Sequence, residues 1–387
     1  MKKIYLIILS YLLISFNTFV LAVENKDGNF LKIGVLAPFS GELKDLGEEI
    51  LYAVNLAIHD IGDSNIKIYP KDSGSKNENL LKACEDFEKE GIRVIIGPAQ
   101  SKSLNELNSF ENLIFLSLSN MDSNIKKNVI MMGINLESQL LSIKDFIKKE
   151  KRKKTVILYP RNEYEKHIEK NIKLANFTKT RMFRYNQDPE ILTKQIEKLT
   201  NYKQRKINLE SRIKKLEGSE EPKDLKELQK LKQKYTLGRL SFDSVIIIDF
   251  GDSLKSVLTS LAYTDVSEKE ILIVTANQWF DKGILEETSI KNFYFPSIHY
   301  KNFDRFNRSF SDIYKYKPNE VTILAYDSVG VTYYLWKKLG DIKSISSFNF
   351  KKDLKGKIGK FRISEGKVIQ KLDIYKIEDG NFVKNKF

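Results

Sequence analysis

The sequence has little cysteine, histidine or tryptophan: one, three and two residues respectively among 387. Because Cys84 is the only cysteine, the chain forms no internal disulfide. In LLKACEDFEKEG it shares a helical face with Leu80, Leu81 and Phe87, so we expect a buried apolar side chain. One thiol and three scattered histidines, without an HExxH motif, exclude the common zinc sites and thiol-nucleophile enzymes.

The sequence also lacks the motifs that mark nucleotide sites and hydrolases. Gly34, Gly41 and Gly47 do not form GxGxxG, and no Gly-Lys-Ser/Thr follows them as a phosphate loop requires. There is no GxSxG nucleophile elbow and no recognisable pair of catalytic carboxylates. We therefore expect a protein that is not an enzyme and that holds neither a metal nor a cofactor.

Long hydrophobic runs are absent except at the N-terminus. MKKIYLIILSYLLISFNTFVLA has two lysines, an apolar stretch and small residues before a cut, so residues 1–22 are predicted to be a signal peptide cleaved after Ala22. The alternative is an uncleaved membrane anchor, because residues 4–23 carry no charge. No cysteine near the cut can carry a lipid, so we expect a periplasmic protein without a lipobox.

The charge is strongly basic but weakly informative. A formal net charge of +14 favours anionic partners in general. The lysines are spread along the chain beside many acids, and no aromatic-basic RNA-binding motif occurs, so we expect no nucleic-acid partner.

Short apolar runs alternate with amphipathic stretches, which predicts βαβ units and parallel sheets. A first series comprises LKIGVLAP, NIKIYP, IRVIIGP, LIFLSLS and VIMMG, and a second comprises KTVILYP, TRMFRY, SVIIIDF and ILIVTA. The two series predict an α/β protein of two similar lobes.

Ligands of such sheets sit beyond the carboxyl ends of the strands, so the polar segments after the apolar runs are candidate ligand contacts. After the first run, a tight turn at Ser40 and Gly41 opens a helix whose N–H groups suit an anion. Loop and cap preferences explain each polar segment taken singly. The segments are 39–41, 100–103, 117–120, 160–164, 250–252 and 277–279, and they supply Asn120 and Asn277 as further candidates.

The motifs IGVLAPFSG, RVIIGPAQS, FLSLSN, LYPRNEYEK, NEVTILAYDSVGVTYYL and GKIGKFRISEGKVIQKLDIYKI, in this order, resemble the type I periplasmic binding proteins, the superfamily of the leucine-binding protein. The resemblance implies two Rossmann-like lobes of parallel sheet flanked by helices, joined by three crossovers and closing on a ligand like a hinged trap. It implies a first lobe from residues 31–136 and 277–342. The second lobe then takes residues 137–276 and the C-terminal strands of 343–387.

Amino-acid binders of that superfamily hold the ligand carboxylate after the third strand, and here this role falls on Ser101, Ser103 and Ser119. Lys102, in the same turn, shifts the expected preference toward anionic ligands. Tyr164 matches a tyrosine that the family places over the ligand from the second lobe. The resemblance leaves the ammonium partner open between Asp249 and Asp252.

One departure points to a branch of the superfamily. Transport-type binders follow the first helix with an Asn-Ala-Gly-Gly-Ile stretch, whereas AVNLAIHDIGDSNIKIYP runs directly to the next strand. The short version resembles the penicillin-binding protein activators, which stimulate peptidoglycan synthases. The expected function is thus an activator or scaffold of peptidoglycan synthesis with a synthase as partner. The alternative is the substrate-binding subunit of an ABC importer for amino acids or small amides, with a permease as partner.

An insertion at residues 190–238 is predicted to form an antiparallel helical hairpin, because leucines recur at near-heptad spacing on both sides of GSEEP. Lengthening a crossover helix past Thr200 places the new residues at the end of the lobe remote from the cleft. Residues 203–234 hold eleven Lys/Arg and six Asp/Glu, so we expect a solvated basic arm. It is either a harmless insertion or a docking arm for a partner protein or an acidic wall polymer, with these candidate contacts: Lys203, Arg205, Lys206, Arg212, Lys214 and Lys215.

Overall fold

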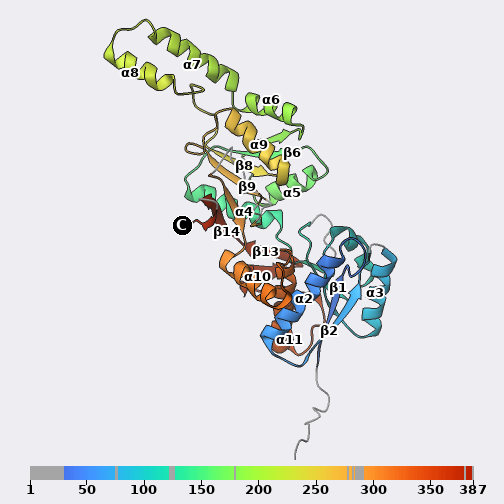
Figure 1. Ribbon diagram of the computed structural model, residues 1–387. Coiled ribbons are helices and arrows are strands. Elements are labelled where there is room, and N and C mark those ends of the chain that lie inside the picture. Colours follow the sequence, from blue (N-terminus) through green and yellow to red (C-terminus); the bar gives the residue numbers. More distant parts are fainter. Residues whose placement is uncertain are drawn as a thin grey trace, which may run out of the picture.

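The computed structural model describes residues 30–74, 77–121, 127–177, 180–276, 279–280, 283, 292–378 and 381–385. Figure 1 shows two α/β lobes arranged end to end, with a pair of helices projecting from the far end of the second lobe. The expected signal peptide at residues 1–22 lies outside the described residues. Within the described ranges, no helix has the length and apolar character needed to cross a membrane.

The first lobe is built on a five-stranded parallel sheet of order β2-β1-β3-β4-β5. Strands β1, β3, β4 and β5 are short and largely apolar, as expected inside a sheet covered on both faces, whereas the edge strand β2 carries Lys67, Lys71 and Asp72. Cys84 is fully buried beside Phe87 under this sheet, as predicted, and burial raises the pKa of its thiol to about 12. The elements are β1 (Leu31–Ala37), α2 (Lys44–Ile61), β2 (Ile66–Asp72), α3 (Asn77–Lys89), β3 (Val94–Ile96), the 3₁₀ helix η1 (Ser101–Ser109), β4 (Ile114–Ser117) and β5 (Val129–Met131).

The second lobe contains a seven-stranded sheet of order β15-β14-β10-β9-β8-β6-β7. Its strands pair in parallel except that β14 runs antiparallel to β10, and β15 to β14. Local caps define its helices: Asn135 accepts a hydrogen bond from the Ser138 N–H at the start of α4 (2.8 Å). The elements are α4 (Leu136–Lys149), β6 (Thr155–Pro160), α5 (Glu165–Leu174), β7 (Arg181–Tyr185), α6 (Pro189–Leu199), β8 (Ser244–Ile248), α9 (Gly251–Tyr263), β9 (Leu272–Ala276), β10 (Tyr294–Ser297), β14 (Asp373–Glu378) and β15 (Asn381–Lys384). The predicted two-lobed α/β architecture is confirmed.

The chain returns to the first lobe after β10. Helices α10 (Tyr300–Tyr314) and α11 (Thr322–Leu339) then pack beside α2 (Figure 1). Tyr52 of α2 stacks there on Tyr314 with ring centroids 4.4 Å apart. The chain then passes through the 3₁₀ helix η3 (Ile345–Phe348) into a small antiparallel sheet, whose strands are β11 (Leu354–Gly356), β12 (Gly359–Ser364) and β13 (Lys367–Lys371).

Two segments depart from the expected lobe boundaries. Strand β10 belongs to the seven-stranded sheet, although residues 277–342 were assigned to the first lobe. The strand has four residues and contains a proline, so it has little periodicity to detect. Strands β11 to β13 form a separate sheet that reaches the first lobe, where the Met131 N–H donates to the Gly366 carbonyl (3.4 Å), whereas residues 343–387 were expected wholly in the second lobe.

The insertion forms a helical hairpin, as predicted, but it does not simply lengthen α6. Helix α6 ends before Thr200, and Asn201 adopts a left-handed conformation with φ of 52°, which turns the chain before α7 (Tyr202–Leu216) begins. Helix α8 (Pro222–Leu231) returns, and its first residue is a proline, which favours a helix start. The pair is closed by a small core of Leu209, Leu216 and Leu231. In Figure 1 it projects away from the rest of the second lobe.

Candidate functional site

A cavity of about 390 Å³ lies between the two lobes. It is bounded by the segments that follow β4, β6 and β8, where parallel sheets commonly bind ligands. Both lobes contribute side chains, so a ligand here would contact both. The lining residues are Ser101, Asn120, Met121, Leu136, Pro160, Asn162, Tyr164, His167, Ile168, Ile248, Asp249, Phe250 and Trp279.

The one carboxylate among the described lining residues is already surrounded by donors from its own lobe. Asp249 follows β8 and is only 5% exposed. It accepts hydrogen bonds from the Tyr185 hydroxyl, the Ser253 hydroxyl (2.5 Å) and the Phe250 N–H (2.9 Å). Burial, with the negative charge of Asp249 close by, raises the pKa of Tyr185 well above its usual range. The carboxylate thus serves as an internal anchor of the site.

Aromatic side chains form part of the wall of the cavity. Tyr164 and Phe250 are 42% and 61% exposed, and Trp279 is half-buried. Carboxamide groups come from Asn120 and Asn162. Among the described lining residues there is no lysine or arginine. The lining therefore offers aromatic faces and neutral polar groups, which suit an uncharged ligand with an apolar face.

The turn after β1 is filled by a side chain of the protein itself. Asp72, at the end of β2, accepts from the Phe39 N–H (2.8 Å), the Ser40 hydroxyl (2.6 Å) and the Gly74 N–H (2.8 Å). Burial raises the pKa of Asp72, but the hydrogen bonds from Ser40, Gly74 and Phe39 outweigh it, and the pKa lies below its usual value. Ser40 and Gly41 do not line the interlobe cavity, so their predicted role in ligand binding has no support in this geometry.

Of the predicted residues that follow β3 and β4, some line the cavity and others do not. Ser101 begins η1 and lines the cavity, and Asn120 lines it as well. Lys102 is exposed and outside the lining. Ser119 is buried, and its hydroxyl accepts from the Met121 N–H (3.2 Å), which stabilises the loop. Ser103 lies in η1, but its side chain falls outside the described part of the structure.

The two candidate ammonium partners also differ. Asp249 lines the cavity, whereas Asp252 is fully exposed and forms an ion pair with Lys255 on α9 (3.6 Å). Asn277 lies outside the described residues. The structure thus brings Ser101, Asn120, Tyr164 and Asp249 together in one cavity.

Several lining residues were not singled out from the sequence. Asn162, Phe250 and Trp279 lie in segments that the strand-end rule had marked, but polarity alone does not choose among their neighbours. His167 lies on α5 one turn beyond Tyr164, so helical spacing from that tyrosine was the available signal.

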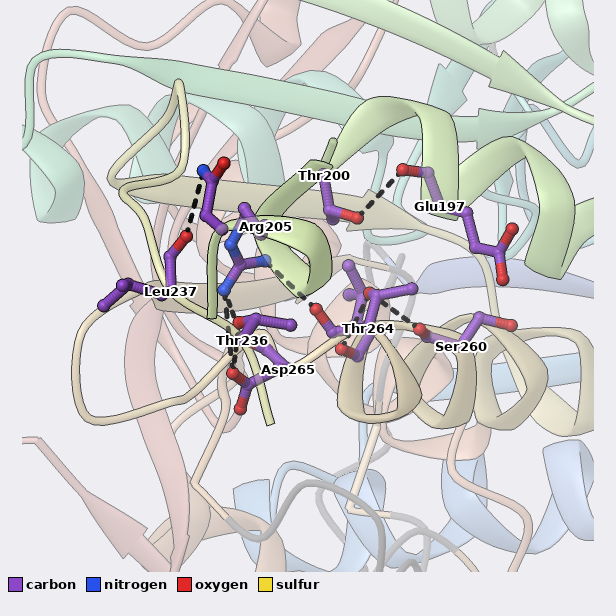
Figure 2. Close-up of polar contacts among 10 residues, drawn as sticks. Glu197, Thr200, Arg205, Thr236, Leu237, Ser260, Thr264 and Asp265 are labelled. Carbon is purple, nitrogen blue, oxygen red and sulfur yellow. Dashed lines mark hydrogen bonds and ion pairs between the residues drawn. The ribbon is translucent and has the colours of Figure 1, made fainter. Parts of the chain in front are cut away.

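The six candidate residues on the arm separate into two groups. Arg205 is 6% exposed and donates from Nη1 to the Thr264 carbonyl and from Nη2 to the Asp265 carbonyl, both at 3.2 Å (Figure 2). Arg212 forms a bidentate pair with Glu227 of α8, at 2.9 Å for both bonds. Arg205 therefore attaches the arm to the lobe, which corrects the expectation that it faces a partner, and the partly exposed Arg212 joins α7 to α8. The remaining four are exposed lysines: Lys203, Lys206, Lys214 and Lys215.

Across the described ranges, no group of three or more His, Cys, Asp or Glu side chains is arranged to hold a metal ion.

Residues 31–176 match the sequence profile of the family described as Periplasmic binding protein. The C-domain of LpoA from Haemophilus influenzae, described as a regulator of PBP1A, is similar with a TM-score of 0.61 at 14% identity, covering 92% of this chain and 100% of that one. Full-length LpoA from the same organism gives 0.63 at 13% identity, covering 94% of this chain and 60% of that one. The leucine-binding protein LivK from Thermotoga maritima gives 0.54 at 13% identity, covering 92% and 98%.

No curated protein sequence matches this chain. At these identities the similar structures show a shared fold, and that fold is the two-lobed one that the sequence motifs predicted.

Proposed function

We propose that this chain, which has the type I periplasmic binding protein fold, is a non-enzymatic periplasmic activator or scaffold of a peptidoglycan synthase. Support comes from the similarity to LpoA, whose C-domain is described as a regulator of PBP1A and is covered from end to end. The direct connection from the first helix to the next strand, between Ile61 and Ile66, also supports it.

The observation that carries the proposal is the state of Asp249. A free amino acid needs a carboxylate for its ammonium group and a cation or N–H cluster for its own carboxylate. In this cavity three internal donors occupy Asp249, and the described lining contains no lysine or arginine. The described lining thus suits a zwitterionic ligand poorly, which favours a role exerted through binding to another protein.

An activator needs only to bind the active shape of its synthase more tightly than the inactive one. A preference of about 1–3 kcal/mol changes the equilibrium roughly 5- to 150-fold, and no proton transfer by the activator is required.

The test is the turnover of lipid-linked peptidoglycan precursor by a detergent-solubilised synthase from the same organism, with and without the mature protein. We expect a saturable increase in rate. Ser101→Ala and Tyr164→Ala should not reduce it, because these residues line the cavity and an activator acts through a surface that contacts the synthase. An unchanged rate at saturating protein would exclude activation of that synthase.

The second candidate is a substrate-binding subunit of an ABC importer. The cavity volume of about 390 Å³ and the contribution of both lobes to its wall favour it. Its test is a thermal-shift panel of amino acids, small amides and neutral aromatic compounds. A ligand-dependent rise in melting temperature that Tyr164→Ala abolishes would support import, and a flat response across the panel would count against it.

A further inference from the structure

The arm formed by α7, α8 and the segment to Lys234 has a concentrated positive charge. Residues 203–234 carry eleven Lys/Arg and six Asp/Glu, a net charge of +5 over 32 residues, while the whole chain has +14 over 387. The density of positive charge is thus about four times the average of the chain. A general bias toward lysine does not account for this difference, because such a bias would act along the whole sequence.

Internal pairing leaves this excess on the outside of the arm. Arg205 is buried at the base, Arg212 is paired with Glu227, and Lys232 is 3.8 Å from Glu217. Eight further lysines are exposed, and only four other acidic residues of the arm are present to balance their charge. These lysines are Lys203, Lys206, Lys214, Lys215, Lys223, Lys226, Lys230 and Lys234.

The arm also exposes apolar and aromatic side chains. Lys223, Lys226 and Lys230 recur at helical spacing along one face of α8. Ile207 of α7 is 52% exposed, Leu225 of α8 is 46% exposed, and Tyr235 just beyond α8 is 77% exposed. None of these three side chains belongs to the apolar core of the hairpin, so they are available to contact another surface.

We propose that the arm binds the surface of an anionic phospholipid membrane. Its charge is complementary to acidic headgroups, and lysines with a few apolar and aromatic side chains are the composition that segments lying in the headgroup region share. A soluble anionic polymer offers charged groups but no apolar region that the exposed Ile207, Leu225 and Tyr235 could contact. Protein interfaces are enriched in arginine and depleted in lysine. Both arginines of the arm form internal contacts and the exposed cations are lysines, so the arm fits a membrane better than a protein partner.

The attachment of the arm to the lobe holds this surface in a defined position from which it can contact a membrane. Arg205 fixes the base of α7 to the end of α9, so the lysines are carried on a defined projection at the pole remote from the first lobe (Figures 1 and 2). Membrane contact there leaves the first lobe and the interlobe cavity accessible. The arm thereby supplies a membrane contact that needs no lipid-bearing cysteine, and it does so whether or not a synthase is the partner.

The test is co-sedimentation of the mature protein with vesicles of phosphatidylglycerol mixed with phosphatidylcholine, and with vesicles of phosphatidylcholine alone. Binding only to the anionic vesicles, and weaker with added salt, is expected. Each lysine near such a surface contributes about fivefold in affinity, so the triple variant Lys223→Gln, Lys226→Gln and Lys230→Gln should bind roughly 100-fold more weakly. The matched control removes three exposed lysines elsewhere, Lys343, Lys351 and Lys352, and should change binding far less.

The double variant Leu225→Ser and Tyr235→Ser separates a bilayer from a soluble polyanion. It should weaken binding to anionic vesicles while binding to polyphosphate stays unchanged. Equal vesicle binding by the arm and control triple variants would overturn the proposal, as would vesicle binding that ignores Leu225→Ser and Tyr235→Ser. Loss of synthase stimulation in detergent by the arm variant, with vesicle binding intact, would overturn it in favour of a protein partner.

Discussion

The guanidinium of Arg205 donates to the main-chain carbonyl of Thr264 at 3.2 Å, which joins the base of the arm to the C-terminal end of α9. The contact closes a ring, because the Leu237 N–H donates to the Arg205 carbonyl (2.9 Å) where the chain returns from the arm. Thr236 adds a hydrogen bond from its hydroxyl to Asp265 (2.5 Å), as Figure 2 shows. The chain is thus anchored beside the end of α9 both where it enters the arm and where it leaves it.

Replacing Arg205 with methionine should release this anchor while the lobes remain folded. The substitution leaves the Thr264 and Asp265 carbonyls without their guanidinium donor, and we expect a cost of about 1–3 kcal/mol. Hydrogen exchange should become faster across residues 202–237. Arg212→Met is the control, because its partly exposed pair with Glu227 is expected to contribute only about 0–1 kcal/mol. Uniformly unchanged exchange in Arg205→Met would show that the arm is held by its apolar core alone.

How far the sequence predicts this structure depends on how local each interaction is. The hairpin was predicted correctly because leucine spacing and the GSEEP break are local signals. The role of Arg205 was missed because its acceptors lie about sixty residues away along the chain. The turn at Ser40 was interpreted as an open anion site for the same reason, since Asp72 arrives from the neighbouring strand. The strand-end rule placed Asn120 at the cavity, and the family resemblance offered Asp249 and Asp252 equally, but only packing decides that Asp252 faces solvent.

Gly47, in the first turn of α2, and Gly330, in the middle of α11, should respond oppositely to alanine. A Cβ on Gly47 of α2 would lie 2.1 Å from the Pro38 carbonyl oxygen, so Gly47→Ala must separate the helix from the turn after β1. A Cβ on Gly330 of α11 meets nothing within 4 Å. Helix propensity alone favours alanine by about 1 kcal/mol. We expect Gly330→Ala to raise the urea midpoint and Gly47→Ala to lower it; a rise in both would mean that the turn yields easily.

Asp327 of α11 should make stability depend on pH. Its buried carboxylate accepts from the Lys357 N–H (2.7 Å) and the Ile358 N–H (2.9 Å), and burial raises its pKa from 3.8 to about 6 despite these bonds. The folded state then holds this proton more tightly than the unfolded state does. Its contribution to the free energy of unfolding is therefore largest below pH about 4 and is lost as the pH rises through about 6.

The variant Asp327→Asn tests this dependence. Urea unfolding at several pH values should show a flatter profile between pH 4 and 6 than the wild type shows, with a lower stability overall, because the amide nitrogen cannot accept one of the two bonds. Asp353→Asn, at a partly exposed carboxylate paired with Arg362 and Lys371, should leave that slope in place. An identical slope in wild type and Asp327→Asn would assign the dependence to other groups.

Tyr185→Phe tests whether Asp249 is an internal anchor or a ligand group. The hydroxyl of Tyr185 is fully buried and donates to Asp249, so its loss should cost about 1–3 kcal/mol of folding stability and leave the carboxylate with one acceptor position open. Tyr69→Phe is the control, since no hydrogen bond from that hydroxyl is seen among the described residues. Thermal shifts with primary amines should be absent in the wild type and in Tyr185→Phe alike, because the acceptor position that the variant frees faces the buried ring of residue 185 and lies away from the cavity. Strong amine binding by the wild type, abolished by Asp249→Asn, would instead make Asp249 a ligand group and favour the importer function.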